Sequence, residues 1–151
     1  MKIEKLYDHL DMAQVVTKFV YDEFVSKSRS RFTLHDVLEF LKKTNKDRLP
    51  ITYVAIENNE CVGTVSLFEN DLSTRRDLSP WLASLVVRHD CRNRGVGEKL
   101  INFAHGEAKA LGYKKLYLKT ENQGSFYGKR GWRYIGKGID SYNQETDLYE
   151  I

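Results

Sequence analysis

Cysteine is rare in this sequence, and long hydrophobic runs are missing. The two cysteines, Cys61 and Cys91, lie far apart and form no Cys-x-x-Cys pair, so we expect no disulfide framework and a reducing, cytoplasmic location. The four histidines are also scattered, which predicts no zinc site and no bound metal. No apolar segment approaches the roughly 18 residues of a membrane helix. The first residues lack the apolar core of a signal peptide, so we expect no membrane partner.

Linkers, repeats and a strong excess of one charge are missing too. Only two prolines interrupt the 151 residues and no segment is low in complexity, so we expect a single domain over residues 1–151. The net charge of +3 is too small to indicate a nucleic-acid partner. Acidic residues also accompany the basic ones in the two arginine-rich stretches, namely Asp71, Asp77 and Asp90. We therefore expect no nucleic acid among the partners.

The hydrophobic periodicity predicts a mixed α/β fold. Amphipathic patterns indicate helices near residues 12–24, 33–41, 96–111 and 125–130. Strands are expected at residues 2–7, 51–57, 61–68, 81–87, 114–120, 132–137 and 146–151. Asn58-Asn59 predicts a hairpin turn, and Thr33 with Asp36 resembles a capping box. The segment WLASLVV (81–87) has Ser84 as its one polar residue, as expected of a central strand.

One turn is basic and contains two glycines: Arg92-Asn93-Arg94-Gly95-Val96-Gly97, between strand 81–87 and the helix after it. The first N–H groups of a helix have no partner within the helix, and the helix dipole adds partial positive charge there. The glycines allow close approach of a ligand, and the arginines add full charges. These features predict a cradle for phosphate or pyrophosphate, although a plain strand-to-helix connection stays open from the turn alone. The pattern is neither a Walker A loop nor Gly-x-Gly-x-x-Gly.

Two motifs together carry a family resemblance. Arg92-x-x-Gly95-x-Gly97 after an apolar strand is similar to the acyl-CoA pyrophosphate loop of the GCN5-related N-acetyltransferases (GNAT), whose pattern is Gln/Arg-x-x-Gly-x-Gly/Ala. Downstream, the stretch FYGKRGW (126–132) resembles the second motif of that family, an aromatic-Tyr pair followed by a Gly-aromatic pair. Each motif alone is weak evidence. The two motifs together occur in the order, at the separation and on the structural elements that the family pattern requires. The sequence is thus identified as a small single-domain, bacterial-type GNAT member, best over residues 50–137.

The resemblance implies a fold and a co-substrate. The fold would be α/β (α+β), with a mixed central sheet splayed between its fourth and fifth strands and flanked by helices. The co-substrate would be acetyl-CoA, whose amide-rich arm could pair with the backbone groups that splayed strands leave free. The residues implied to bind it are Leu85, Val86, Val87, Arg92, Asn93, Arg94, Gly95, Val96, Gly97, Asn122 and Tyr127. For Asn122, capping of the next helix is an alternative.

The implied reaction transfers the acetyl group of acetyl-CoA to a primary amine by direct attack in a ternary complex. Tyr127 would be the general acid, because a phenol with a pKa near ~10 keeps its proton at neutral pH and can donate to the departing thiolate. The amine must lose a proton, but strand 81–87 offers no carboxylate. Glu69 and Asp71, just after the preceding strand, are the nearest candidate bases, with solvated loop charges as the plainer interpretation.

Some questions stay open at this stage. The acceptor could be a small metabolite, a peptide N-terminus or a protein lysine. A CoA-binding sensor or regulatory module with little catalysis is an alternative from another class. Many members of the family are dimers, so a homodimer is one assembly that the resemblance allows.

Overall fold

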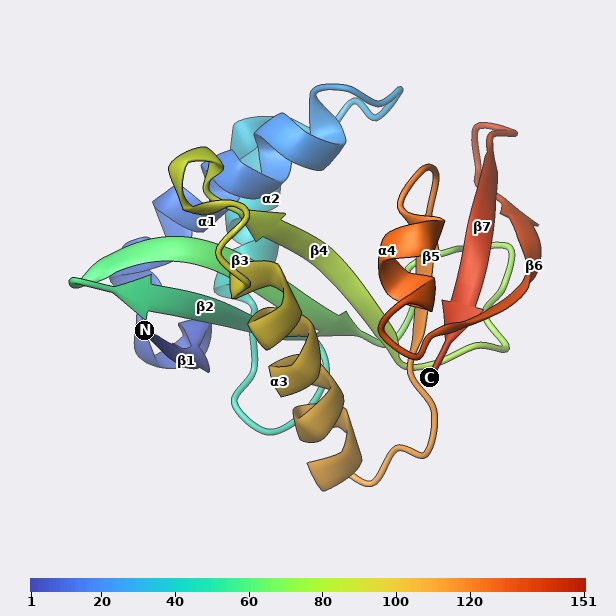
Figure 1. Ribbon diagram of the computed structural model, residues 1–151. Helices are drawn as coiled ribbons and strands as arrows, with labels where there is room; N and C mark the ends of the chain where they lie inside the picture. Colours follow the sequence, from blue (N-terminus) through green and yellow to red (C-terminus); the bar gives the residue numbers. More distant parts are fainter.

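A single seven-stranded sheet forms the centre of the computed structural model, which describes residues 1–151 (Figure 1). The strand order is β1-β2-β3-β4-β5-β7-β6, and only the β4–β5 pair is parallel. The strands are β1 (Lys2–Lys5), β2 (Ile51–Glu57), β3 (Glu60–Phe68), β4 (Trp81–Val87), β5 (Tyr117–Thr120), β6 (Arg133–Ile139) and β7 (Glu145–Glu150). The mixed α/β sheet expected from the sequence is therefore confirmed.

Helices cover both faces of this sheet. They are α1 (Ala13–Val20), α2 (Leu34–Lys42), α3 (Val96–Ala110) and the short α4 (Gly124–Gly128). Alternate residues of β2 point to the two faces: Val54 joins a small core with α1 and α2, whereas Tyr53 joins the main core with α3. None of the helices combines the length and apolar character that crossing a bilayer requires.

Several local signals act as the sequence predicts. Thr33 and Asp36 form a capping box, with each side chain accepting the backbone N–H of the other residue at 3.1 and 2.9 Å. Asn58 and Asn59 adopt positive φ values of 51° and 63° in the β2–β3 turn. These features depend on neighbours in the chain, which is why the sequence carries them.

The sheet opens between β4 and β5. The two strands are paired only at Trp81 and Tyr117, and beyond that pair they diverge (Figure 1). Within β4, Ser84 and Leu85 together face Val65 of β3, because Thr64 pairs with Val86 and Ser66 with Ala83. This bulge gives Ser84 a positive φ of 56°, which is unusual for a residue with a side chain. The expected splay between the fourth and fifth strands is confirmed.

Three elements differ from the expectation. The strand expected over residues 2–7 ends at Lys5, and Leu6–Asp8 form a 3₁₀ turn. The helix expected over residues 12–24 is broken: a 3₁₀ turn at Leu10–Met12 precedes α1, and a π-helical turn at Tyr21–Val25 follows it. The strand expected over residues 114–120 begins only at Tyr117. Lys114 and Lys115 are exposed and belong to the connection from α3. The π-helical turn matters below, since it carries a carboxylate into the cleft.

Candidate active site

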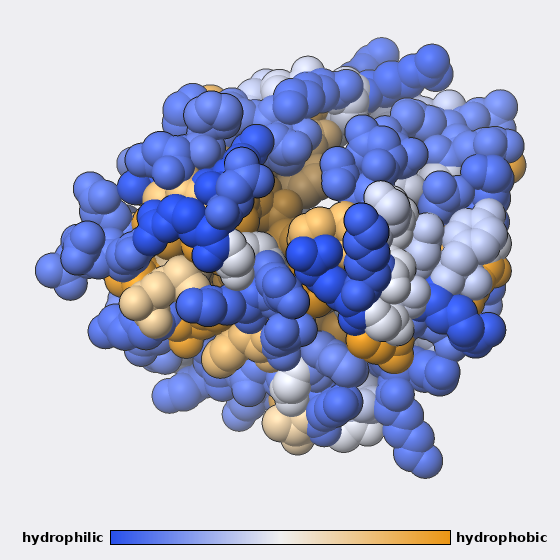
Figure 2. All heavy atoms as spheres, in the orientation of Figure 1, coloured by the Kyte–Doolittle hydropathy of each residue, from blue (hydrophilic) through white to orange (hydrophobic).

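A cleft of about 360 Å³ lies where β4 and β5 part. The space-filling view shows this hollow with hydrophobic surface inside and hydrophilic side chains around it (Figure 2). Its lining comes from the end of β4, the start of α3, α4 and the π-helical turn after α1. Among the residues expected to bind a ligand, the cleft is lined by Leu85, Val86, Val87, Arg92, Asn93, Gly95, Val96, Gly97 and Tyr127. The structure therefore brings most of them together.

The turn before α3 has the geometry of an anion cradle. Gly95 is the N-cap with φ +80°, and a Cβ built there would meet nothing within 4 Å. The first N–H to bond within the helix is that of Lys99, to the carbonyl of Gly95 at 3.1 Å. The N–H groups of residues 96–98 are thus left without helical partners at the cleft wall. The residues present therefore fit a phosphate-bearing ligand.

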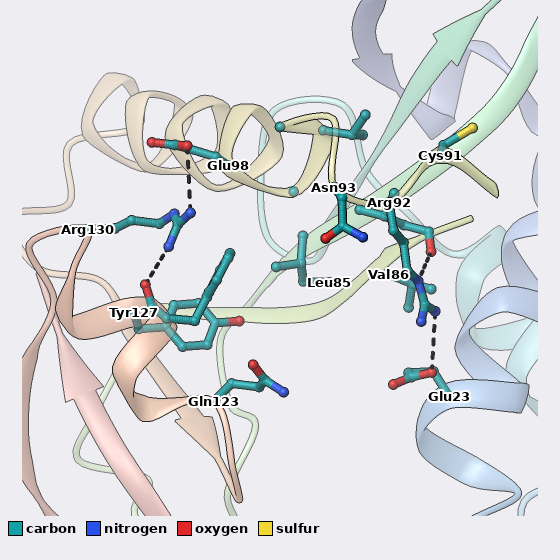
Figure 3. A pocket seen from close by; sticks show the side chains of 15 residues that line it. Glu23, Leu85, Val86, Cys91, Arg92, Asn93, Glu98, Gln123, Tyr127 and Arg130 are labelled. Atoms are coloured by element: carbon teal, nitrogen blue, oxygen red, sulfur yellow. Dashed lines mark hydrogen bonds and ion pairs between the residues drawn. The ribbon is translucent and has the colours of Figure 1, made fainter. Parts of the chain in front are cut away.

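The two arginines of the turn have different positions. Arg92 lines the cleft, where its Nε donates to the carbonyl of Val87 at 3.0 Å. The guanidinium of Arg92 also lies 3.9 Å from the carboxylate of Glu23, as Figure 3 shows. Arg94 instead pairs with both oxygens of Glu57 at 2.8 and 3.1 Å, and its side chain is not part of the lining. Of these two arginines, only Arg92 thus offers its side-chain charge to the cleft.

Glu23 is a lining residue that the sequence analysis missed. It lies on the π-helical turn after α1 and also contacts Lys27 at 3.5 Å. No local signal marks this residue, because more than sixty residues separate it from the turn that it faces. Its carboxylate lies against Arg92, the one arginine of the turn that faces the cleft.

Tyr127 lies on the opposite wall, in α4, with its phenol directed into the cleft (Figure 3). Its ring packs edge-on against Phe126 and Trp132, with centroids 5.2 and 5.9 Å away. Burial raises the pKa of Tyr127 to about 12, despite the opposing effect of Arg130. The phenol is thus held in one orientation and remains a proton donor at any physiological pH.

Arg130 connects the two walls of the cleft. Its guanidinium lies 3.7 Å above the ring of Phe126 and donates to the carbonyl of the same residue at 2.8 Å. It also reaches Glu98 of α3 at 3.7 Å (Figure 3). The sequence analysis did not include Arg130 in the site. Its position between α4 and α3 fixes the orientation of the α4 turn that carries Tyr127.

Asn122 does not take the capping position suggested as its alternative role. The N-cap of α4 is Gln123, and no side chain caps this helix. The hydroxyl of Thr120 accepts the backbone N–H of Gln123 at 3.0 Å and so closes the turn before α4. Gln123, rather than Asn122, lines the cleft. The sequence offered no signal to choose between these adjacent amides.

The two candidate bases lie in different surroundings. Glu69 is exposed just after β3, whereas Asp71 is half-buried. Burial raises the pKa of Asp71 to about 6, and the charge of Lys119 opposes this only in part. No group of three or more His, Cys, Asp or Glu residues is placed to hold a metal ion.

The fold and the cleft together define a class of protein: one with a sheet splayed between two parallel strands and an anion cradle at the start of the helix that follows the first of them. The sequence matches the Acetyltransferase (GNAT) family over residues 17–132. The chain belongs to this family.

Individual relatives agree with this assignment. The chain is 25% identical to N-alpha-acetyltransferase 30 of Schizosaccharomyces pombe over 143 residues, which cover 87% of each protein. Its fold is similar to that of an aminoglycoside 6'-N-acetyltransferase complexed with coenzyme A, with a TM-score of 0.77, 15% identity and coverage of 100% of this chain and 96% of the other. A GNAT-family acetyltransferase of Staphylococcus aureus gives a TM-score of 0.71 at 19% identity, covering 99% and 98%. At these low identities, the similarity to the two solved structures shows the fold of this chain and nothing about its substrate.

Proposed function

We propose that the protein is an acetyl-CoA-dependent N-acetyltransferase that acetylates a primary amine by direct attack in a ternary complex. The observation that carries this proposal is the course of the cleft. It leads from the cradle at Gly95 along the unpaired edge of β4 to the phenol of Tyr127. One end thus suits an anionic group, and the other offers a buried hydrogen-bond donor. Family membership and the CoA-bound structural neighbour support this choice.

The binding roles follow from the lining. The free N–H groups at the start of α3 and the guanidinium of Arg92 would hold the pyrophosphate. The backbone of Leu85, Val86 and Val87 would pair with the amide groups of the pantetheine arm, because β5 does not pair with them. Arg94 would contribute through its backbone, since its side chain pairs with Glu57.

Tyr127 would assist the departure of the CoA sulfur. A thiol has an ordinary pKa near ~8.5, so complete proton transfer from a phenol of pKa about 12 to a thiolate is uphill by about 5 kcal/mol. We therefore propose that Tyr127 acts as a general acid through a strong hydrogen bond to the developing thiolate, with only partial proton transfer in the transition state. A hydrogen bond to a charged group contributes about 1.5–3 kcal/mol.

A primary amine is the acceptor class that we propose. One relative carries the name of an N-alpha-acetyltransferase, and the structural neighbours include aminoglycoside acetyltransferases. The two free cysteines are both buried, and we propose a reducing compartment as the place of action. Whether the protein forms a homodimer stays a prediction.

The test is a calorimetric titration with acetyl-CoA, followed by a thiol-release assay over a panel of amines. The panel includes free peptide α-amines, an N-terminally blocked lysine peptide and an aminoglycoside. Binding with thiol release on one of them is the expected result. Binding without release on any amine would favour a CoA-binding sensor. Absence of binding would refute the cradle assignment.

A further inference from the structure

The cradle, α3 and α4 belong to the main core on one face of the sheet. With CoA bound on that face, an amine would reach the thioester from the other one. The loop of residues 69–80 packs on that face, where Leu72 is buried with Trp81 and Leu148 in a small core of their own. Trp81 forms the one β4–β5 pair with Tyr117, and Tyr117 packs against the same small core. The loop therefore borders the point where the two strands part.

Several contacts fix the position of this loop. The indole N–H of Trp81 donates to the carbonyl of Leu78 at 2.7 Å. The hydroxyl of Thr74 donates to the carbonyl of Ile139 at 2.5 Å, which joins the loop to the end of β6. Leu72 also lies directly against Gly138, because a Cβ built on that glycine would come within 2.8 Å of its Cδ2. A side chain next to Leu72 is thus held on a rigid support.

That neighbour is Asp71. Its carboxylate is half-buried and has neither a hydrogen bond nor an ion pair, so burial raises its pKa to about 6. Lys119, the one charged group that acts on it, belongs to β5 just beyond the last β4–β5 pair. A half-buried carboxylate without a partner, beside the opening between β4 and β5, is a candidate for a functional role.

The other charges around Asp71 are paired with each other or exposed. In its own loop, Arg75 pairs with Asp77, whereas Glu69 and Arg76 are exposed. On β6 and β7, Lys137 pairs with Asp147. Because Leu148 faces the small core, the neighbouring Asp147 points to the opposite face of the sheet.

We propose that Asp71 is the proton acceptor of the reaction, taking the proton of the acceptor amine directly or through one water. The inference rests on the proposed acetyl transfer. The amine nitrogen forms a bond to the carbonyl carbon while the C–S bond breaks and its electron pair leaves with sulfur. The nitrogen's proton goes to Asp71, which later returns it to solvent. The thiolate receives the hydrogen bond of Tyr127 and finally a proton.

The raised pKa suits this role, and the pKa of the amine itself decides how readily its proton is given up. An ordinary Asp has a pKa near ~3.9, so a carboxylate with a pKa of about 6 is roughly 100-fold more basic. At pH 7 it is still mostly ionised and can accept a proton. An α-amine with a pKa near ~8 gives up its proton to this group about 250-fold more readily than a lysine amine near ~10.4. We therefore expect faster turnover of a peptide α-amine than of a blocked lysine peptide.

The test compares Asp71→Asn with two controls, Asp77→Asn in the same loop and Glu69→Gln at the alternative base. For Asp71→Asn we expect kcat at pH 7 to fall about 100-fold, with acetyl-CoA affinity within twofold of wild type. The wild-type kcat should rise with pH through a limb near 6, and this limb should be missing in the variant. Asp77→Asn should remain within threefold of wild type, and Glu69→Gln tests the alternative base. A loss of activity in Glu69→Gln with retention in Asp71→Asn would overturn the assignment.

A second measurement does not need turnover. The carboxyl ¹³C resonance of Asp71 should titrate near pH 6 in the free protein, and a pKa below about 4.5 would refute the proposal even if no acceptor had been found. Because the native pKa exceeds the unfolded one, wild-type stability falls as pH rises from about 4 to 6. Asp71→Asn should therefore melt at a higher temperature than wild type at pH 7, and the difference should vanish near pH 4. A variant that melts lower at pH 7 would indicate a structural role and contradict the proposal.

Discussion

The two glycines of the cradle should respond oppositely to alanine. Gly95 has φ +80°, a left-handed conformation that costs a residue with a Cβ roughly 1–2 kcal/mol. Gly97 lies in the first turn of α3, where a new Cβ would make an ordinary contact of 3.6 Å with Val87. Within a helix, alanine is more favourable than glycine by about 0.5–1 kcal/mol. Gly95→Ala should therefore destabilise the fold, whereas Gly97→Ala should be neutral or stabilising.

The expected difference between the two variants is large enough to measure. Adding the two effects gives about 1.5–3 kcal/mol in the free energy of unfolding. For a domain of 151 residues, 1 kcal/mol corresponds to a Tm change of roughly 2–4 °C. The two Tm values should therefore differ by roughly 3–12 °C in thermal denaturation. Urea denaturation should rank the two variants in the same order of stability. Equal stability of the two variants would refute the left-handed assignment of Gly95.

Measuring acetyl-CoA affinity separates the backbone strain at Gly95 from the effect of a charge placed there. Gly95→Glu places an extra negative charge where the phosphates are proposed to lie, and Gly95→Gln is its neutral match with the same backbone strain. We expect calorimetry to detect no acetyl-CoA binding to Gly95→Glu and weakened binding to Gly95→Gln. Gly97→Ala should bind normally, because the family pattern accepts alanine there. Equal affinities of the glutamate and glutamine variants would contradict a phosphate site at this turn.

Further expectations concern other residues of the cleft. Tyr127→Phe should lower kcat roughly 10- to 100-fold while acetyl-CoA affinity stays within threefold; near wild-type turnover would show that another group assists the thiolate. Glu23→Gln should tighten acetyl-CoA binding about two- to fivefold, because it removes the carboxylate 3.9 Å from Arg92; unchanged or weaker affinity in calorimetry contradicts this. Arg92→Gln should weaken binding about tenfold, and Arg94→Gln less than threefold, since its side chain pairs outside the cleft; equal losses would place both side chains at the phosphates. Gly63→Ala should lower unfolding free energy by about 1–3 kcal/mol in urea, because its Cβ would lie 3.0 Å from a leucine of α3 and 3.1 Å from the backbone of β4; an unchanged midpoint would mean that α3 moves freely.

The sequence predicted those parts of the site that depend on neighbouring residues. The strand before the turn, the two glycines and the helix after it form a continuous stretch, so spacing alone indicates an anion cradle. Tyr127 was identified from its motif, and the structure places it on the cleft wall. The role of each of these residues stays a prediction until binding and turnover are measured.

Features that depend on tertiary contacts could not be predicted. The pairing of Arg94 with Glu57 needs the cradle to meet the end of β2, and the approach of Glu23 needs a π-helical turn that no residue pattern announces. The raised pKa of Asp71 depends on how Leu72 packs against a strand more than seventy residues later in the chain. The bulge at Ser84 had only one hint, the single polar residue in an apolar strand.

The single residue pair between β4 and β5 has a consequence for the evolution of this fold. Closing the two strands into a regular ladder would satisfy backbone groups and so would raise stability. The same change would fill the gap in which the ligand is proposed to lie. Selection for thermal robustness alone would therefore drive this chain toward an inert, closed sheet. Substitutions that stabilise it without loss of function should be found away from the β4–β5 edge.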